Sequence, residues 1–168
     1  MIGPKPGIEP KPGTGPKPGL IPWPPVIYAA AILISVVLGL YIPLPWIGDL
    51  LGDILFAAGW VALFAVAVLW FTAIRTMIRA RTTLNPNAVP DHLVTTGPFG
   101  VSRNPMYLAN TLLLIGVAFV SGIAWFFLLA FVAAFVTQKV AIEGEEKILA
   151  AKFGKKYRDY AKRVRRWI

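Results

Sequence analysis

The sequence predicts an all-α integral membrane protein: a helical bundle with about four transmembrane helices and no Rossmann domain. Three observations support this prediction. Hydrophobic residues make up 57% of the 168 positions, more than a soluble domain of this length carries. Three long stretches contain no charged residue, and every Lys and Arg falls outside them. No Gly-x-Gly-x-x-Gly motif follows a strand pattern, so nothing indicates a dinucleotide-binding fold.

Charge and composition limit the chemistry that this chain can perform. Seventeen Lys and Arg oppose eight Asp and Glu, for a net charge of +9. In so apolar a chain, this excess suggests cytoplasmic loops and anionic lipid before nucleic acid. The absence of Cys excludes thiolate metal sites, a cysteine nucleophile and disulfides, and a single His excludes a His-rich metal cluster. We therefore expect neither a metal nor a nucleic-acid partner.

Residues 1–20 form a repetitive arm. The tetrapeptide Pro-Lys-Pro-Gly occurs at positions 4–7, 10–13 and 16–19. This composition favours polyproline II and cannot bury a core, so we expect the arm to be disordered. It also lacks the apolar stretch of a signal peptide, and the first hydrophobic segment is therefore expected to stay in the protein as an anchor.

Residues 21–82 contain the first two predicted membrane helices. The first, residues 26–42, is slightly short for a span and ends where prolines interrupt it. The second covers residues 54–74, which are 21 uncharged positions. Asp49 and Asp53 precede it and are placed to cap its start.

The third charge-free stretch runs from 104 to 138 and is too long for one straight span. Its 35 residues would extend roughly 52 Å as a helix, against a bilayer core of about 30 Å. Ser121-Gly122 lies near its middle, so we predict a hairpin of two short helices. One long tilted helix is the alternative.

The distribution of positive charge agrees with four spans. The arm carries three Lys, the connection from 75 to 104 carries four Arg, and the residues after 138 carry ten Lys and Arg. With a hairpin, these three regions lie on one side of the membrane, and the opposite loops carry none. The positive-inside rule then places both termini in the cytoplasm, most simply at a bacterial inner membrane.

The last segment has the pattern of a basic amphipathic helix. Lys and Arg alternate with apolar residues at steps of mostly three and four. We expect it to lie on the cytoplasmic headgroups. The apolar positions are Ile142, Leu149, Phe153, Tyr157, Tyr160, Val164 and Trp167.

Residues 83–168 are the expected functional core. Two segments there, 93–107 and 143–160, are richer in polar and glycine residues than a membrane anchor requires. One directly precedes the predicted hairpin and the other directly follows it. A hairpin brings its two ends together, so the two segments should meet.

Single residues in these segments have structural as well as functional explanations. Arg103 can bind a phosphate or carboxylate, or it can anchor a helix at the interface. Glu145 and Glu146 project about 100° apart on a helix, so one of them should face the pocket. The alternative for both is a solvated carboxylate paired with Lys. Asn104 can cap a helix that starts at the next residue, and Tyr107 can be an interfacial aromatic.

Taken as a set, the residues of both segments form a recognisable pattern. Its members are Gly97-Pro98-Phe99, Arg103-Asn104-Pro105-Met106-Tyr107, Glu145-Glu146, Phe153-Gly154, Tyr157, Tyr160 and Val164. This pattern resembles the isoprenylcysteine carboxyl methyltransferase and phospholipid methyltransferase superfamily. The resemblance covers roughly residues 90–168, about half of the chain, and the first two spans match only as hydrophobic helices.

The resemblance implies an integral membrane enzyme that transfers a methyl group from S-adenosylmethionine to a lipid-like or small amphiphilic acceptor. It also implies that the last spans and the cytoplasmic tail enclose the cofactor. Phe99 stands where relatives commonly have Tyr. The implied cofactor contacts are Leu93, Val94, Phe99, Asn104, Pro105, Met106, Tyr107 and Glu145.

Two departures from the isoprenylcysteine enzymes bear on the acceptor. Those enzymes have Arg-His-Pro where this chain has Arg103-Asn104-Pro105. They also place a substrate-binding Arg four residues before the cofactor-binding Glu, and this chain has Ala141 there. The resemblance therefore favours an acceptor other than a prenylated cysteine carboxylate.

Three residues are the implied catalytic candidates. Arg103 would orient an acidic group of the acceptor, and Glu146 or Tyr107 would take a proton from an amine acceptor. Glu145 is assigned to the ribose or amino group of the cofactor, because a carboxylate beside the sulfonium would stabilise the ground state.

Two other functions are compatible with the sequence. The same chemistry could serve an isoprenylcysteine carboxylate or a small thiol. A non-enzymatic scaffold in the lipid bilayer, with a basic lipid-binding tail and an arm that recruits a partner, is the alternative from another class. Cofactor binding discriminates between an enzyme and a scaffold.

Overall fold

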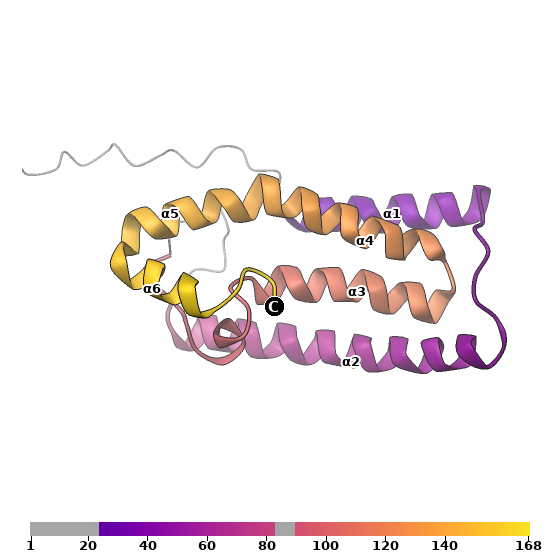
Figure 1. The fold of residues 1–168 in the computed structure, drawn as a ribbon, viewed down its shortest axis with the longest axis horizontal. Coiled ribbons are helices and arrows are strands. Elements are labelled where there is room, and N and C mark those ends of the chain that lie inside the picture. The colour runs from indigo at the N-terminus through magenta and orange to yellow at the C-terminus, as the bar shows by residue number, and fades with distance from the viewer. Residues whose placement is uncertain (1–23, 83–89) are drawn as a thin grey trace, which may run out of the picture.

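The computed structural model describes residues 24–82 and 90–168, and they form a bundle of four apolar helices extended at one end by two shorter ones (Figure 1). The four are α1 (Pro24–Tyr41), α2 (Asp49–Arg79), α3 (Pro105–Ser121) and α4 (Ala124–Thr137). Helix α3 lies between α2 and α4, and α1 packs along α4. The predicted disordered arm lies outside the described residues.

The remaining elements gather at the end of the bundle where α2 ends and α3 begins. A 3₁₀ turn, Gly97–Gly100, precedes α3, and a π-helical segment, Gln138–Ile142, joins α4 to α5 (Glu143–Phe153). Helix α6 (Lys155–Arg163) follows. Within the part of the chain that the structure describes, there is no strand, only an isolated bridge between Ser102 and Arg165. The predicted all-α bundle is confirmed.

The surface of the bundle is that of a membrane protein. Large apolar side chains such as Leu40, Val61 and Phe64 are exposed, whereas the core is built of small residues and a few large ones. In the part of the chain that the structure describes, three helices have the length and composition to cross a bilayer: α1, α2 and the continuous helix from Ala124 to Phe153. Helix α3 is a shorter apolar helix of 17 residues, about 26 Å long, and it packs against α2 and α4. The chain is an integral membrane protein.

The predicted hairpin is present, and the alternative of one long tilted helix is wrong. Helix α3 ends at Gly122, whose φ of 70° lies in the left-handed region that favours glycine. Its amide donates to the carbonyl of Ala118 at 2.9 Å. A Cβ at Gly122 would lie 3.3 Å from Trp46 Cδ1, so the indole packs directly against the turn.

Two helix ends differ from the predictions. Helix α2 begins at Asp49 with Gly48 as its N-cap and no side-chain cap, so Asp49 and Asp53 do not act as caps. The C-terminal region is two helices and not one, because the chain turns at Gly154, whose φ is 52°. This turn directs Tyr157 and Tyr160 into the protein, where both are buried, and not onto the headgroups.

Close packing of α2 against α3 depends on glycine. A Cβ at Gly59 would lie 2.7 Å from Val120 Cγ2, and 3.0 Å from both the carbonyl oxygen of Gly116 and Phe119 Cβ. In a bilayer, such small residues let two backbones approach and so increase dispersion contact.

We predict that Gly59→Ala destabilises the bundle by about 1 to 3 kcal/mol, because the added methyl group must push α3 away. Thermal unfolding in detergent, followed by circular dichroism, measures this. Gly48→Ala is the matched control, since nothing lies within 4 Å of its Cβ position. An equal or smaller loss for Gly59→Ala than for the control would contradict this account of the packing.

Candidate active site

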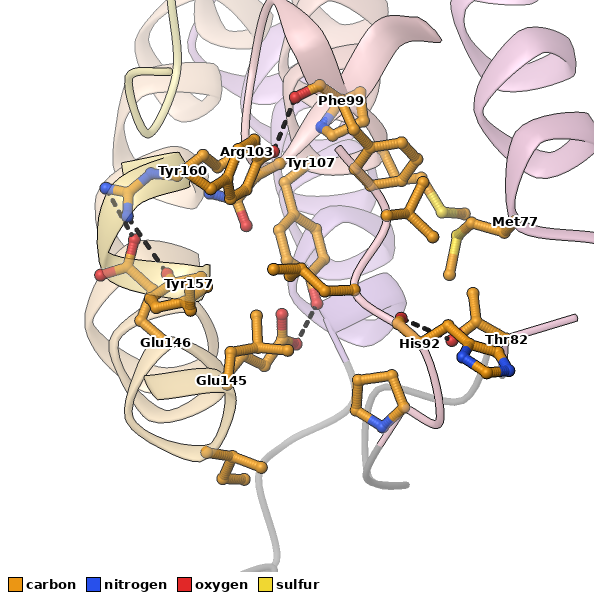
Figure 2. Close-up of a pocket in the computed structure, with 18 of the residues that line it drawn as sticks. Met77, Thr82, His92, Phe99, Arg103, Tyr107, Glu145, Glu146, Tyr157 and Tyr160 are labelled. Carbon is orange, nitrogen blue, oxygen red and sulfur yellow. Dashed lines mark hydrogen bonds and ion pairs between the residues drawn. The ribbon is translucent and has the colours of Figure 1, made fainter. Parts of the chain in front are cut away.

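A cavity of about 250 Å³ lies at the charged end of the bundle, between the start of α3, the end of α2 and helices α5 and α6 (Figure 2). The volume of this cavity exceeds the volume that a few water molecules occupy. Most of the side chains that line it are apolar or aromatic. Every site residue predicted from the sequence lines this one cavity. They are Leu93, Val94, Phe99, Arg103, Asn104, Pro105, Met106, Tyr107, Glu145 and Glu146.

Glu145 and Tyr107 form a bridge across the cavity. The Tyr107 hydroxyl, in the first turn of α3, donates to Glu145 Oε1 on α5 at 2.6 Å (Figure 2). Among the described residues, no cation lies within ion-pair distance of Glu145. A carboxylate that faces a cavity with a single hydroxyl partner retains capacity to accept hydrogen bonds from a cationic or hydroxyl-bearing ligand.

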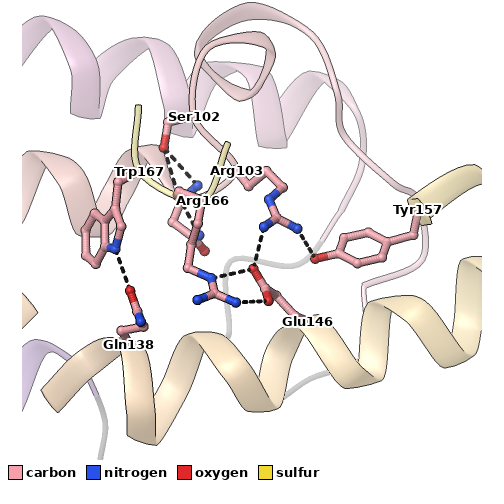
Figure 3. Close-up of polar contacts among 8 residues, drawn as sticks. Ser102, Arg103, Gln138, Glu146, Tyr157, Arg166 and Trp167 are labelled. Atoms are coloured by element: carbon pink, nitrogen blue, oxygen red, sulfur yellow. Dashed lines mark hydrogen bonds and ion pairs between the residues drawn. The ribbon is translucent and has the colours of Figure 1, made fainter. Parts of the chain in front are cut away.

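Glu146 differs from its neighbour, because it is held by two arginines. Arg166 binds it with two hydrogen bonds, Nε to Oε1 at 3.0 Å and Nη2 to Oε2 at 2.7 Å. Arg103 Nη2 lies 3.1 Å from Glu146 Oε1, and Arg103 also donates to the Tyr157 hydroxyl at 3.1 Å (Figure 3). From the helical spacing we expected one of the two glutamates to face the pocket; both line it, with different partners.

The loop before α3 is paired with the residues that follow α6. The Arg103 amide donates to the carbonyl of Arg165 at 3.0 Å. The Arg166 carbonyl accepts from Ser102 Oγ at 3.3 Å and from Asn104 Nδ2 at 3.0 Å. Asn104 is the N-cap residue of α3, but its side chain does not cap the helix; it is used for this cross-chain bond.

The 3₁₀ turn supplies one wall of the cavity, and α6 holds that turn in place. The Tyr160 hydroxyl donates to the carbonyl of Phe99 at 2.6 Å. Burial raises the pKa of Tyr160 to about 12. Burial and the nearby Glu146 carboxylate raise the pKa of Tyr157 as well. Both phenols are therefore protonated throughout the physiological range; Tyr160 donates to the Phe99 carbonyl, and Tyr157 accepts from Arg103.

Below the cavity, polar contacts fix the first turns of α3. The Tyr28 hydroxyl from α1 lies 2.8 Å from Thr111 Oγ1 and 3.3 Å from the Tyr107 carbonyl. The Trp70 indole donates to Asn110 Oδ1 at 3.1 Å. These bonds join α1 and α2 to α3 inside the apolar layer, where a polar group without a partner is costly.

Eleven further residues that line the cavity are not predicted from the sequence. Ile148 and Leu149 follow Glu145 by one turn of α5, so their helical spacing was a usable signal. The contributions of α1 and α2 had no such signal, because they depend on how the helices pack. The missed residues are Pro24, Pro25, Met77, Thr82, Pro90, His92, Asn110, Ile148, Leu149, Tyr157 and Tyr160.

Comparison with known proteins identifies a family. A family model described as phospholipid methyltransferase matches residues 52–156. This range runs from the first turns of α2 to the start of α6 and includes every site residue predicted from the sequence. No curated protein and no solved structure matches the chain.

We predict that Tyr160→Phe lowers the free energy of unfolding by about 1 to 3 kcal/mol at pH 8, because the Phe99 carbonyl loses its donor. The pKa of Tyr160 is higher in the folded protein than the ordinary value of 10.0, so the phenol stabilises the fold fully below pH 10. This contribution is lost as the pH rises toward about 12.

Thermal unfolding of both proteins from pH 8 to pH 11.5 measures the difference. The gap between wild type and Tyr160→Phe should narrow above pH 10, while the other titrating groups cancel in the comparison. A difference in unfolding free energy that does not change with pH would mean that the hydrogen bond donated by the Tyr160 hydroxyl does not stabilise the fold.

Proposed function

Because the chain belongs to the phospholipid methyltransferase family, we propose that it transfers a methyl group from S-adenosylmethionine to a lipid-like or small amphiphilic acceptor at the cytoplasmic face of a membrane. The observation that carries this proposal is the Glu145–Tyr107 pair. It places a carboxylate with spare acceptor capacity in a largely apolar cavity at the charged end of a membrane bundle.

The residues of the cavity fit the methyl donor by their chemistry. Glu145, with Tyr107 beside it, would accept hydrogen bonds from the ribose hydroxyls or the amino group. Phe99 and Met106 offer apolar and aromatic surface for the adenine and the sulfur. In this proposal the remaining contacts come from the loop and the first turn of α3, at Leu93, Val94, Asn104 and Pro105.

S-adenosylmethionine supplies a methyl group on a positively charged sulfur, and this methyl group is transferred by in-line displacement. The protein's task is to align the acceptor and to exclude water. The apolar walls at Leu93, Val94 and Met106 serve exclusion. We assign Glu145 to the polar end of the donor, since a carboxylate against the sulfur would favour the ground state.

Arg103 is the residue that we assign to an acidic group of the acceptor. Its side chain is 14% exposed, lines the cavity and has an Nε with no hydrogen-bond partner among the described residues. An amine acceptor must also lose a proton. We propose that Tyr107 takes this proton while it passes its own hydroxyl proton to Glu145 Oε1, 2.6 Å away. Glu146 is the alternative base, but both of its oxygens are already paired with Arg103 and Arg166.

The acceptor proposed here is not a prenylated cysteine carboxylate. The position at which isoprenylcysteine enzymes carry an Arg is Ala141, and this residue is completely buried in the π-helical segment. A phospholipid amine, an isoprenoid, a fatty acid or a small thiol remain as candidates, each entering laterally from the bilayer.

The charge distribution supports a cytoplasmic site. Arg75, Arg79 and Arg103 lie at the cavity end of the bundle, with the cations of α5 and α6. The loops at the other end, residues 42–48 and 122–123, contain no Lys or Arg. By the positive-inside rule, we propose that the cavity opens to the cytoplasm of a bacterial inner membrane.

We expect the detergent-purified protein to bind S-adenosylhomocysteine saturably, and Glu145→Gln to weaken this binding roughly tenfold or more, because charged hydrogen bonds are lost. Calorimetry measures both. Glu143→Gln is the matched control: the same substitution on the same helix, at a carboxylate that pairs with Lys139 outside the cavity. Absence of binding by wild type in detergent and nanodiscs would overturn the proposal in favour of a membrane scaffold.

We also expect radiolabelled methyl transfer to a component of a bacterial lipid extract. Arg103→Ala should reduce turnover roughly tenfold or more at saturating S-adenosylmethionine, because the acceptor's acidic group loses a charged hydrogen bond. Arg79→Ala, which removes an exposed cation outside the cavity, should leave turnover unchanged. Unaltered turnover in Arg103→Ala would remove its acceptor role.

A further inference from the structure

Residues 164–167, here called the strap, directly follow α6, and Figure 3 shows the contacts that Arg166 and Trp167 make. None of these residues lines the cavity itself. They nevertheless contact both sides of it. On one side is the loop that leads into α3, and on the other is the helix that carries the two glutamates.

The strap is bonded to the loop by main-chain groups. The carbonyls of Arg165 and Arg166 accept from the Arg103 amide, from Ser102 Oγ and from Asn104 Nδ2 at 3.0 to 3.3 Å. Ser102 is buried, with 1% of its surface exposed. The three residues that directly precede α3 are therefore all held by the strap.

The strap is bonded to the opposite helix by side chains. The Arg166 guanidinium donates hydrogen bonds to both carboxylate oxygens of Glu146. The Trp167 indole donates to Gln138 Oε1 at 2.8 Å. Glu146 is 82% buried by side-chain area and Arg166 is 31% exposed. A bidentate arginine–carboxylate pair fixes orientation as well as distance.

From this double attachment we infer that Arg166 is a positioning residue of the proposed methyl-donor site. It holds α5 against the loop before α3, so that Glu145 on α5 stays within hydrogen-bond distance of Tyr107 on α3. It acts through Glu146, which it also shares with Arg103. This inference rests on the proposed function. Arg166 supports the site from outside the cavity and does not itself contact the ligand.

The test compares two neighbouring arginines. Arg166→Gln removes the pair with Glu146, whereas Arg165→Gln removes the same charge from an exposed side chain whose structural bond comes from its carbonyl. We expect Arg166→Gln to weaken S-adenosylhomocysteine binding roughly tenfold, Arg166→Lys to recover part of it, and Arg165→Gln to match wild type. Calorimetry gives the dissociation constant, and thermal unfolding is recorded beside it.

Three results would overturn the inference. The first is a dissociation constant within twofold of wild type in Arg166→Gln, even with a lowered melting temperature, since that indicates a structural role alone. The second is an equal loss in Arg165→Gln. If Arg166→Gln does not fold, Arg166→Lys decides, and unchanged binding there is the third.

A double variant tests the route through Glu146. Glu146→Gln with Arg166→Gln should bind no more weakly than Glu146→Gln alone, because the second change removes a partner that is already lost. Fully additive losses would show that Arg166 acts elsewhere. Failure of wild type to bind at all would instead remove the proposed function itself, so the two failures are distinguishable.

Discussion

The reversal of the chain at Gly122 is the constraint on which the rest of the structure depends. A left-handed residue there ends α3 and starts α4 within three positions, and the two helices then run back along each other. As a result, residues that are about forty positions apart in the sequence, such as Tyr107 and Glu145, meet at the opposite end of the hairpin. The cavity is a consequence of this fold: one wall is the entrance to α3 and the other is the exit from α4.

Placing carboxylates at the edge of an apolar layer requires partners for them, and the two glutamates meet this requirement differently. Glu146 is neutralised within the protein by Arg103 and Arg166, which makes it part of the framework. Among residues 24–82 and 90–168, the Tyr107 hydroxyl is the one side-chain partner of Glu145. Glu146 is fully paired, whereas its neighbour Glu145 can accept further hydrogen bonds. We therefore assign ligand binding to Glu145. Binding energy from a cation or hydroxyl would then repay its desolvation.

Sequence patterns predicted the helical class and the hairpin, because these follow from local signals: charge-free length and a glycine near the middle. The family resemblance, and not a local pattern, supplied ten of the residues that line the cavity, and eleven other lining residues were not predicted. The break at Gly154 was missed, since the amphipathic spacing continues across it. The use of Asn104 as a partner of the Arg166 carbonyl and the contribution of Met77 from α2 were also missed. Both depend on packing between distant segments, which no local pattern records.

The central claim is that the methyl donor binds between α3 and α5. An experimental structure of the protein with S-adenosylhomocysteine tests it most directly. The account predicts ligand density inside the cavity, with a ribose hydroxyl or amino group against the Glu145 carboxylate and the adenine beside Phe99. Ligand density anywhere else on the protein, or an empty cavity at saturating ligand, would contradict the account.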